Sequence, residues 1–160
     1  KFKIIFCFNI LRIRINMFNN LIHSFLSYTI AFCVGIFVIT YFLKIPHLVT
    51  GQPQIVNEYY QTNYLKNIPL DYLFVLLYLL VAQIPIRIFN LQGKLVQLLM
   101  VALTTGLLTA FFCYLFVSRP IQKGNFFSKW FHTVGYTSVI YDIILLVFIY
   151  ITYLYLEHKK

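Results

Sequence analysis

Four long runs of apolar residues, separated by polar segments, dominate this 160-residue chain. They cover residues 21–43, 72–89, 95–117 and 134–156. A helix needs about 20 mainly apolar residues to cross roughly 30 Å of hydrocarbon; three runs reach that length and the second is slightly shorter. The runs also lack the alternation of polar and apolar positions that a membrane β-barrel strand shows. The pattern predicts an all-α fold, an integral membrane four-helix bundle with short loops, in which residues 1–160 form one membrane domain.

Proline and acidic residues indicate the limits of the second run. Pro69 and Asp71 precede it; proline is tolerated in the first turn of a helix, and an acid there complements the helix dipole. Pro85 is expected to bend or end the helix near Arg87. We therefore expect the second span to begin close to Asp71.

The composition excludes the soluble globular class. Hydrophobic residues make up 61% of the chain and charged residues 11%, whereas about a quarter of the residues in soluble domains are charged. The formal net charge of +9 comes from 13 Lys and Arg against four acids. These basic residues are spread over the loops without a dense cluster. They indicate contact with anionic lipid headgroups and argue against nucleic-acid binding.

The N-terminal segment, KFKIIFCFNILRIRIN at residues 1–16, carries four basic residues and no acid. This composition fits an interfacial N-terminal helix, a targeting sequence, or translation upstream of a start at Met17, and the sequence leaves these open. With four spans, eight Lys and Arg lie on the side of the two termini and five on the other side, which favours both ends inside. Without residues 1–16 the comparison is four against five, so the orientation depends on this segment.

Two of the expected spans carry small residues four positions apart. The first span has Ser27, Ala31 and Gly35, and the third has Ala102, Gly106 and Ala110. Residues at this spacing share a helix face and let two backbones approach closely in lipid, where helix association depends on packing. We therefore expect close contact between the first and third spans. The competing interpretation is that small residues are simply common in membrane helices.

Asp142 is the only acid placed well inside an expected span. A carboxylate near the centre of a membrane helix costs about 2.5–3.5 kcal/mol, so it should face the bundle and have a partner. In an antiparallel bundle its level is shared by Thr109 and Tyr78. A structural hydrogen bond with Ser138 or Tyr78, or a position at the interface, competes with a role as proton relay or ion ligand. We favour the structural interpretation because the opposite half of the membrane offers few polar groups.

The two longest connections, residues 44–70 and 118–133, combine charged and aromatic side chains. Asn125 is placed to cap a short helix whose aromatic residues enter the bilayer edge. The expected interfacial or partner-contact residues are Glu58, Tyr59, Tyr60, Arg119, Lys123, Lys129 and Trp130. An ordinary solvated connection is the competing interpretation for residues 44–70.

Histidines, cysteines and acids are scattered among different elements, without metal-ligand spacing. The chain has no nucleophile elbow, P-loop, dinucleotide fingerprint or Cys-x-x-Cys pair. The sequence therefore predicts no metal, no cofactor and no enzymatic activity.

The stretch at residues 119–157, most specifically WFHTVGYTSVIYDIILLVFIY at residues 130–150, resembles the C-terminal span of small multi-span membrane proteins of nucleocytoplasmic large DNA viruses. The resemblance covers about a quarter of the chain. It implies a capsid-associated component of the virion inner membrane, with loops that contact minor capsid proteins, and it implies no catalytic residues.

The leading functional prediction is a non-enzymatic structural membrane protein that anchors a larger protein assembly, here a viral capsid, to its bilayer. Its partners would be other membrane or capsid proteins, contacted through residues 44–70 and 118–133. Two alternatives stay open. One is an accessory membrane subunit of an organellar energy-transducing complex in the mitochondrial inner membrane. The other is a small transporter or channel component that uses Asp142.

Overall fold

The computed structural model describes residues 20–122 and 124–158, and these residues form helices without any strand. The predicted all-α fold is therefore confirmed for this part of the chain. The basic segment at residues 1–16 and Lys123 lie outside the described residues. Within the described ranges, four helices are long and apolar enough to cross a membrane. They are Asn20–Phe42, α4 (Tyr64–Ile88), α5 (Lys94–Val117) and α7 (Thr137–His158).

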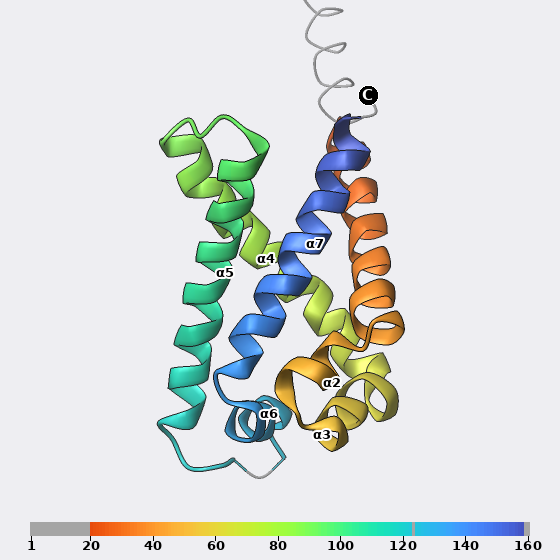
Figure 1. Ribbon diagram of the computed structural model, residues 1–160, viewed down its shortest axis with the longest axis vertical. Coiled ribbons are helices and arrows are strands. Elements are labelled where there is room, and N and C mark those ends of the chain that lie inside the picture. Colours follow the sequence, from red (N-terminus) through yellow and green to blue (C-terminus); the bar gives the residue numbers. More distant parts are fainter. Residues whose placement is uncertain (1–19, 123, 159–160) are drawn as a thin grey trace, which may run out of the picture.

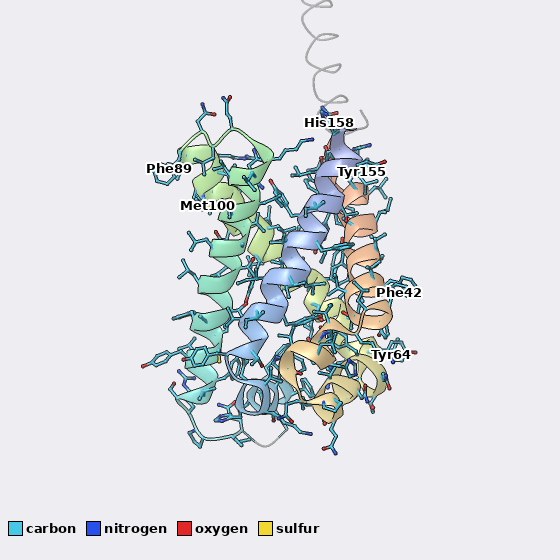
Figure 2. The ribbon with its side chains drawn as sticks, viewed as in Figure 1. Phe42, Tyr64, Phe89, Met100, Tyr155 and His158 are labelled. Carbon is cyan, nitrogen blue, oxygen red and sulfur yellow. The ribbon has the colours of Figure 1, made fainter. Side chains whose placement is uncertain are left out.

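Large apolar side chains cover the outside of these four helices. Phe42 and Phe89 are 72% and 69% exposed, and both project outward from the bundle (Figure 2). Soluble proteins rarely expose contiguous apolar surface on this scale. The spans and their apolar surface together make this a membrane protein, with lipid as the solvent of its outer face.

α7 is the central helix of the bundle. It lies between α5 on one side and the first spanning helix on the other, while α4 crosses behind it (Figure 1). α4 and α5 form an antiparallel hairpin, and its short turn uses left-handed backbone at Asn90 and Gly93, with φ of 46° and 107°. From this hairpin the two helices separate toward the opposite end of the molecule, where α5 and α4 lie on different sides of α7 (Figure 1).

The expected contact between the first and third spans is wrong, because the glycines of both small-residue stripes face α7. A Cβ atom added to Gly35 would collide with Ile149, and one added to Gly106 would lie 3.2 Å from Ile143 Cδ1. Small size permits close approach but does not choose the neighbouring helix.

The remaining stripe residues differ in burial. Ser27 and Ala31 are buried. Ala102 and Ala110 are only half-buried, because the buried face of α5 lies one position earlier. That face consists of Val101, Thr105, Thr109 and Cys113.

α4 begins before the apolar run that predicts it. The helix starts at Tyr64, so Pro69 and Asp71 lie inside it, and it ends at Ile88, close to the expected end near Arg87. The helical residues before the apolar run are stabilised by a tertiary contact. Asn67 is buried, and its Nδ2 donates a hydrogen bond of 3.1 Å to the backbone oxygen of Tyr59. Asp71 is therefore about two turns inside a spanning helix instead of at its first turn.

The segment between the first span and α4 is folded, which corrects the idea of a solvated connection. It forms α2 (Ile45–Thr50), α3 (Pro53–Asn57) and η2 (Glu58–Thr62). Left-handed backbone at Lys44 and Gly51, with φ of 50° and 63°, turns the chain at both ends of α2. These short helices gather with α6 (Phe126–Val134) at one end of the bundle (Figure 1).

α6 has the N-cap that the sequence predicts: the Ser128 backbone N–H donates to Asn125 Oδ1 at 3.1 Å. One face of the helix is polar and exposed at Lys129, whereas Trp130 and Phe131 on the other face are buried. These aromatic side chains pack against the bundle, not into the bilayer edge. α6 and η2 consequently cover the same end of the protein (Figure 1).

Candidate functional site

A cavity of about 170 Å³ lies beside η2 and α6, between the ends of α4, α5 and α7. Ten of its fifteen lining residues are aromatic, and two are the acids Asp71 and Asp142. No Lys, Arg or His is among the described residues that line it. The cavity thus combines an apolar, aromatic wall with two carboxyl groups that come from different helices.

Asp71 enters the cavity from α4. Its Oδ1 accepts a hydrogen bond from the Tyr59 hydroxyl of η2, while its Oδ2 is buried and has no hydrogen-bond partner within the described part of the chain. The contact between Asn67 and the Tyr59 backbone fixes η2 beside this turn of α4. One carboxylate oxygen is therefore held by protein, and the other is unpaired at the cavity wall.

Asp142 enters from α7, and its Oδ2 accepts a hydrogen bond of 2.8 Å from Thr109 Oγ1 of α5. Thr109 is fully buried, so this bond joins the two helices inside the bundle. Of the other expected partners, Ser138 donates instead to the Gly135 backbone oxygen at 2.7 Å. Tyr78 lines the cavity and stacks on Phe112, with ring centroids 6.4 Å apart.

A tyrosine network forms the wall behind the two acids. The hydroxyls of Tyr60 and Tyr141 are 2.7 Å apart, and Thr40 Oγ1 lies 3.1 Å from the Tyr141 hydroxyl. Burial raises the pKa of the Tyr59 and Tyr60 hydroxyls well above their ordinary value, and the nearby Asp71 carboxyl adds to the shift for Tyr59. Both side chains therefore stay neutral at physiological pH, and Tyr59 keeps the proton that it donates to Asp71.

The electrostatics of this cavity favour a positively charged occupant. Burying a carboxylate in apolar surroundings costs free energy unless it is paired with an opposite charge or well hydrogen-bonded. Within the described residues, Tyr59 donates to Asp71 and Thr109 to Asp142, and no basic side chain lines the cavity wall. Aromatic faces also attract cations, by about 0.5–2 kcal/mol each.

The residues expected to contact lipid headgroups or a partner differ in their burial. Tyr59, Tyr60 and Trp130 are buried inside the chain, which corrects their assignment to an outer contact surface. The correction has a physical reason: η2 and α6 are amphipathic segments whose aromatic sides cover the end of the bundle.

Glu58, Arg119 and Lys129, the charged members of that set that the structure describes, stay at the surface. Glu58 and Lys129 form an ion pair of 2.5 Å between η2 and α6. Arg119 is exposed, and its backbone oxygen lies 3.0 Å from His132 Nε2. The ion pair ties η2 to α6 at the surface, and the His132 contact ties α6 to the segment that follows α5.

Sequence reasoning missed Asp71, although a signal for it was present. Asp71, Val75, Tyr78 and Ala82 follow one another at helical spacing of four, three and four, and the last three are buried. Extending that buried face by one turn would have placed the acid inside the bundle. Thr105 was also missed: its Oγ1 is buried and has no hydrogen-bond partner in the described residues.

The described residues contain no candidate metal site, and comparisons with known proteins give no match. In residues 20–122 and 124–158, no group of three His, Cys, Asp or Glu side chains is placed to hold a metal ion. The chain has no significant match to a family model, to a curated protein or to a solved structure. The resemblance to membrane proteins of large DNA viruses therefore stays a prediction.

Proposed function

We propose that this membrane protein binds a small organic cation in the cavity between α4, α5, α6 and α7. The proposal is carried by the convergence of Asp71 and Asp142 on one aromatic cavity without a lining base. It develops the transport alternative that rests on Asp142, because a site between spanning helices can hold a cation on its way through the membrane. No catalytic step is part of it.

Each acid has a defined role in this function. The unpaired Oδ2 of Asp71 is the first acceptor for an ammonium group, because it is buried without another donor. Asp142 supplies the second carboxylate, oriented by Thr109. Tyr59 orients Asp71 in the same way from η2. The neutral aromatic walls replace water around the apolar part of the ligand.

The cavity volume limits the size of that ligand. An apolar cavity of roughly 150 Å³ accommodates a molecule the size of benzene. At about 170 Å³, this cavity is suited to an ammonium group attached to one ring or a short branched chain. Benzylammonium is therefore a suitable probe, and benzyl alcohol is its uncharged match.

The test is equilibrium binding of both probes to the full chain in lipid nanodiscs. We expect benzylammonium to bind about ten-fold or more tightly than benzyl alcohol, since a charged hydrogen bond contributes about 1.5–3 kcal/mol. Asp71→Asn and Asp142→Asn should each remove most of that preference, and the double variant all of it.

Glu157→Gln provides a matched control, because Glu157 lies at the other end of α7, 3.1 Å from His23. It should leave the preference unchanged. Thermal unfolding of each variant separates loss of the site from loss of the fold. Equal binding of the two probes to the wild-type protein, or an unchanged preference in the folded double variant, would refute the proposal.

The anchoring function stays a prediction with less support from the geometry. Its aromatic contact residues Tyr59, Tyr60 and Trp130 lie in the core and are therefore not available to a partner at the outer surface. Arg119 and Lys129 remain at the surface as headgroup or partner contacts.

A further inference from the structure

Buried aromatic rings form the wall of the cavity on the side of η2 and α6. Tyr59, Tyr60 and Trp130 are buried there, and Tyr59 packs on Trp130 with ring centroids 5.0 Å apart. The ion pair between Glu58 and Lys129 lies outside this aromatic layer. The layer consists of buried rings, and the hydroxyls of Tyr59 and Tyr60 are engaged by Asp71 and Tyr141 inside the bundle.

The exposed part of the cavity wall lies between α4 and α5. Phe74 of α4 is 38% exposed, and Phe112 of α5 and Phe127 of α6 are half-buried. The Phe74 ring meets both in edge-on contacts, with centroids 6.5 Å from Phe112 and 5.7 Å from Phe127. These three phenylalanines, here called the phenylalanine gate, form the part of the cavity wall that reaches the protein surface between α4 and α5.

The surface around this gate is apolar. Leu73 and Leu77 of α4 and Phe111 of α5 are exposed beside it, all on spanning helices. The opening therefore faces the hydrocarbon of the bilayer. A charged group has no favourable route through such a surface, whereas an alkyl chain and an uncharged amine group can pass it. The amine then becomes an ammonium group by taking a proton from one of the two carboxyl groups in the cavity, which leaves a carboxylate as its partner.

We infer that the cavity takes its ligand sideways from the bilayer through the phenylalanine gate, and that this ligand is a long-chain amine whose ammonium group reaches Asp71 and Asp142 while its tail stays in lipid. The inference rests on the proposed cation site and adds the class of ligand and its route. A phospholipid does not fit these requirements, because its phosphate would meet two carboxylates without a basic partner in the described wall.

Dodecylammonium tests the ligand class in the nanodisc assay. It should displace benzylammonium from the wild-type protein, and Asp71→Asn with Asp142→Asn should abolish its binding. Failure of the long-chain amine to displace bound benzylammonium would overturn the inference and leave the proposed function intact. Absence of carboxylate-dependent benzylammonium binding would instead remove the proposed function itself.

Photo-crosslinking tests the route. Dodecylammonium with a diazirine in the first half of its chain, close to the ammonium group, should label Phe74 and the neighbouring Leu73 and Phe111, as mapped by mass spectrometry. Labelling confined to α2 and α3 would place the tail at the end of the bundle instead of between α4 and α5, and would overturn the lateral route.

A bulky residue in the gate supplies a kinetic test. Phe74→Trp should slow association of dodecylammonium several-fold, because the larger ring fills the opening. Leu103→Trp is the matched control: Leu103 is exposed on α5, and helical periodicity places it on the face opposite Phe112. Equal association rates in Phe74→Trp and the wild-type protein would count against passage through the gate.

Discussion

The Tyr59 hydroxyl donates a hydrogen bond to the Asp71 carboxyl and so joins η2 to α4 inside the bundle. The two residues are twelve positions apart and belong to separate elements. This contact brings an acid that precedes the second apolar run into the wall of a membrane cavity. It also makes the folded connection before α4 part of the candidate site.

Loss of the Tyr59 hydroxyl should destabilise the protein. In Tyr59→Phe, the buried Asp71 carboxyl loses its protein donor, and a buried acceptor without a partner costs about 1–3 kcal/mol. We expect a lower melting temperature for the purified protein. Tyr64→Phe, at an exposed tyrosine of the same region, should change it little. Similar melting temperatures for the two variants would show that the bond adds nothing.

Removal of the Thr109 hydroxyl should weaken both stability and cation binding. Thr109→Val keeps the shape of the side chain but removes the 2.8 Å bond to Asp142, at a cost of about 1–3 kcal/mol. Thr104→Val on the same helix, at a half-buried position, is the control. The measurements are thermal unfolding and benzylammonium binding. A larger loss in Thr104→Val than in Thr109→Val would contradict the assigned role.

A methyl group at Gly35 should be more harmful than one at Gly106. The new Cβ in Gly35→Ala would collide with Ile149, and overpacking of this kind costs about 1–3 kcal/mol. In Gly106→Ala the nearest atom is the flexible end of Ile143, 3.2 Å away. Adding Ile149→Ala to Gly35→Ala should recover part of the loss, as measured in a double-mutant cycle of melting temperatures. Equal effects of the two glycine variants would argue against this packing of α7.

Stability should fall at alkaline pH because of Tyr59 and Tyr60. Burial raises their pKa above the ordinary 10.0 in the folded protein, so above about pH 10 the unfolded chain loses these protons first. The folded state then binds more protons than the unfolded state, and the free energy of unfolding decreases by up to about 1.4 kcal/mol per pH unit for each group. Melting temperatures between pH 8 and 11 measure this slope.

Tyr60→Phe supplies the comparison for that slope. The variant lacks one of the two shifted hydroxyls, so its melting temperature should fall less steeply above pH 10 than that of the wild-type protein. Identical slopes in both proteins would exclude Tyr60 as a source of the alkaline effect.

The sequence predicted local features well where a local cause was sufficient. The helix of the third run, Lys94–Val117, differs by one residue from the predicted 95–117, because hydrocarbon burial and backbone hydrogen bonding act on that segment directly. Asn125 caps α6 as predicted, since the cap needs only residues three positions apart. The position of Asp71 could not be obtained in this way, because the polar turn before the apolar run is helical through its contact with η2.

Hydrophobicity and helix periodicity by themselves determined that this chain is an all-α membrane protein with four long apolar helices, because each such helix satisfies its own backbone in lipid. Only the tertiary structure decided which helix faces which, since small or aromatic side chains allow several neighbours of similar energy. It placed Gly35 and Gly106 against α7 and turned Tyr59 inward. It also brought Asp71 and Asp142, seventy-one residues apart in the chain, to one cavity. Their meeting depends on long-range packing, which no local pattern encodes.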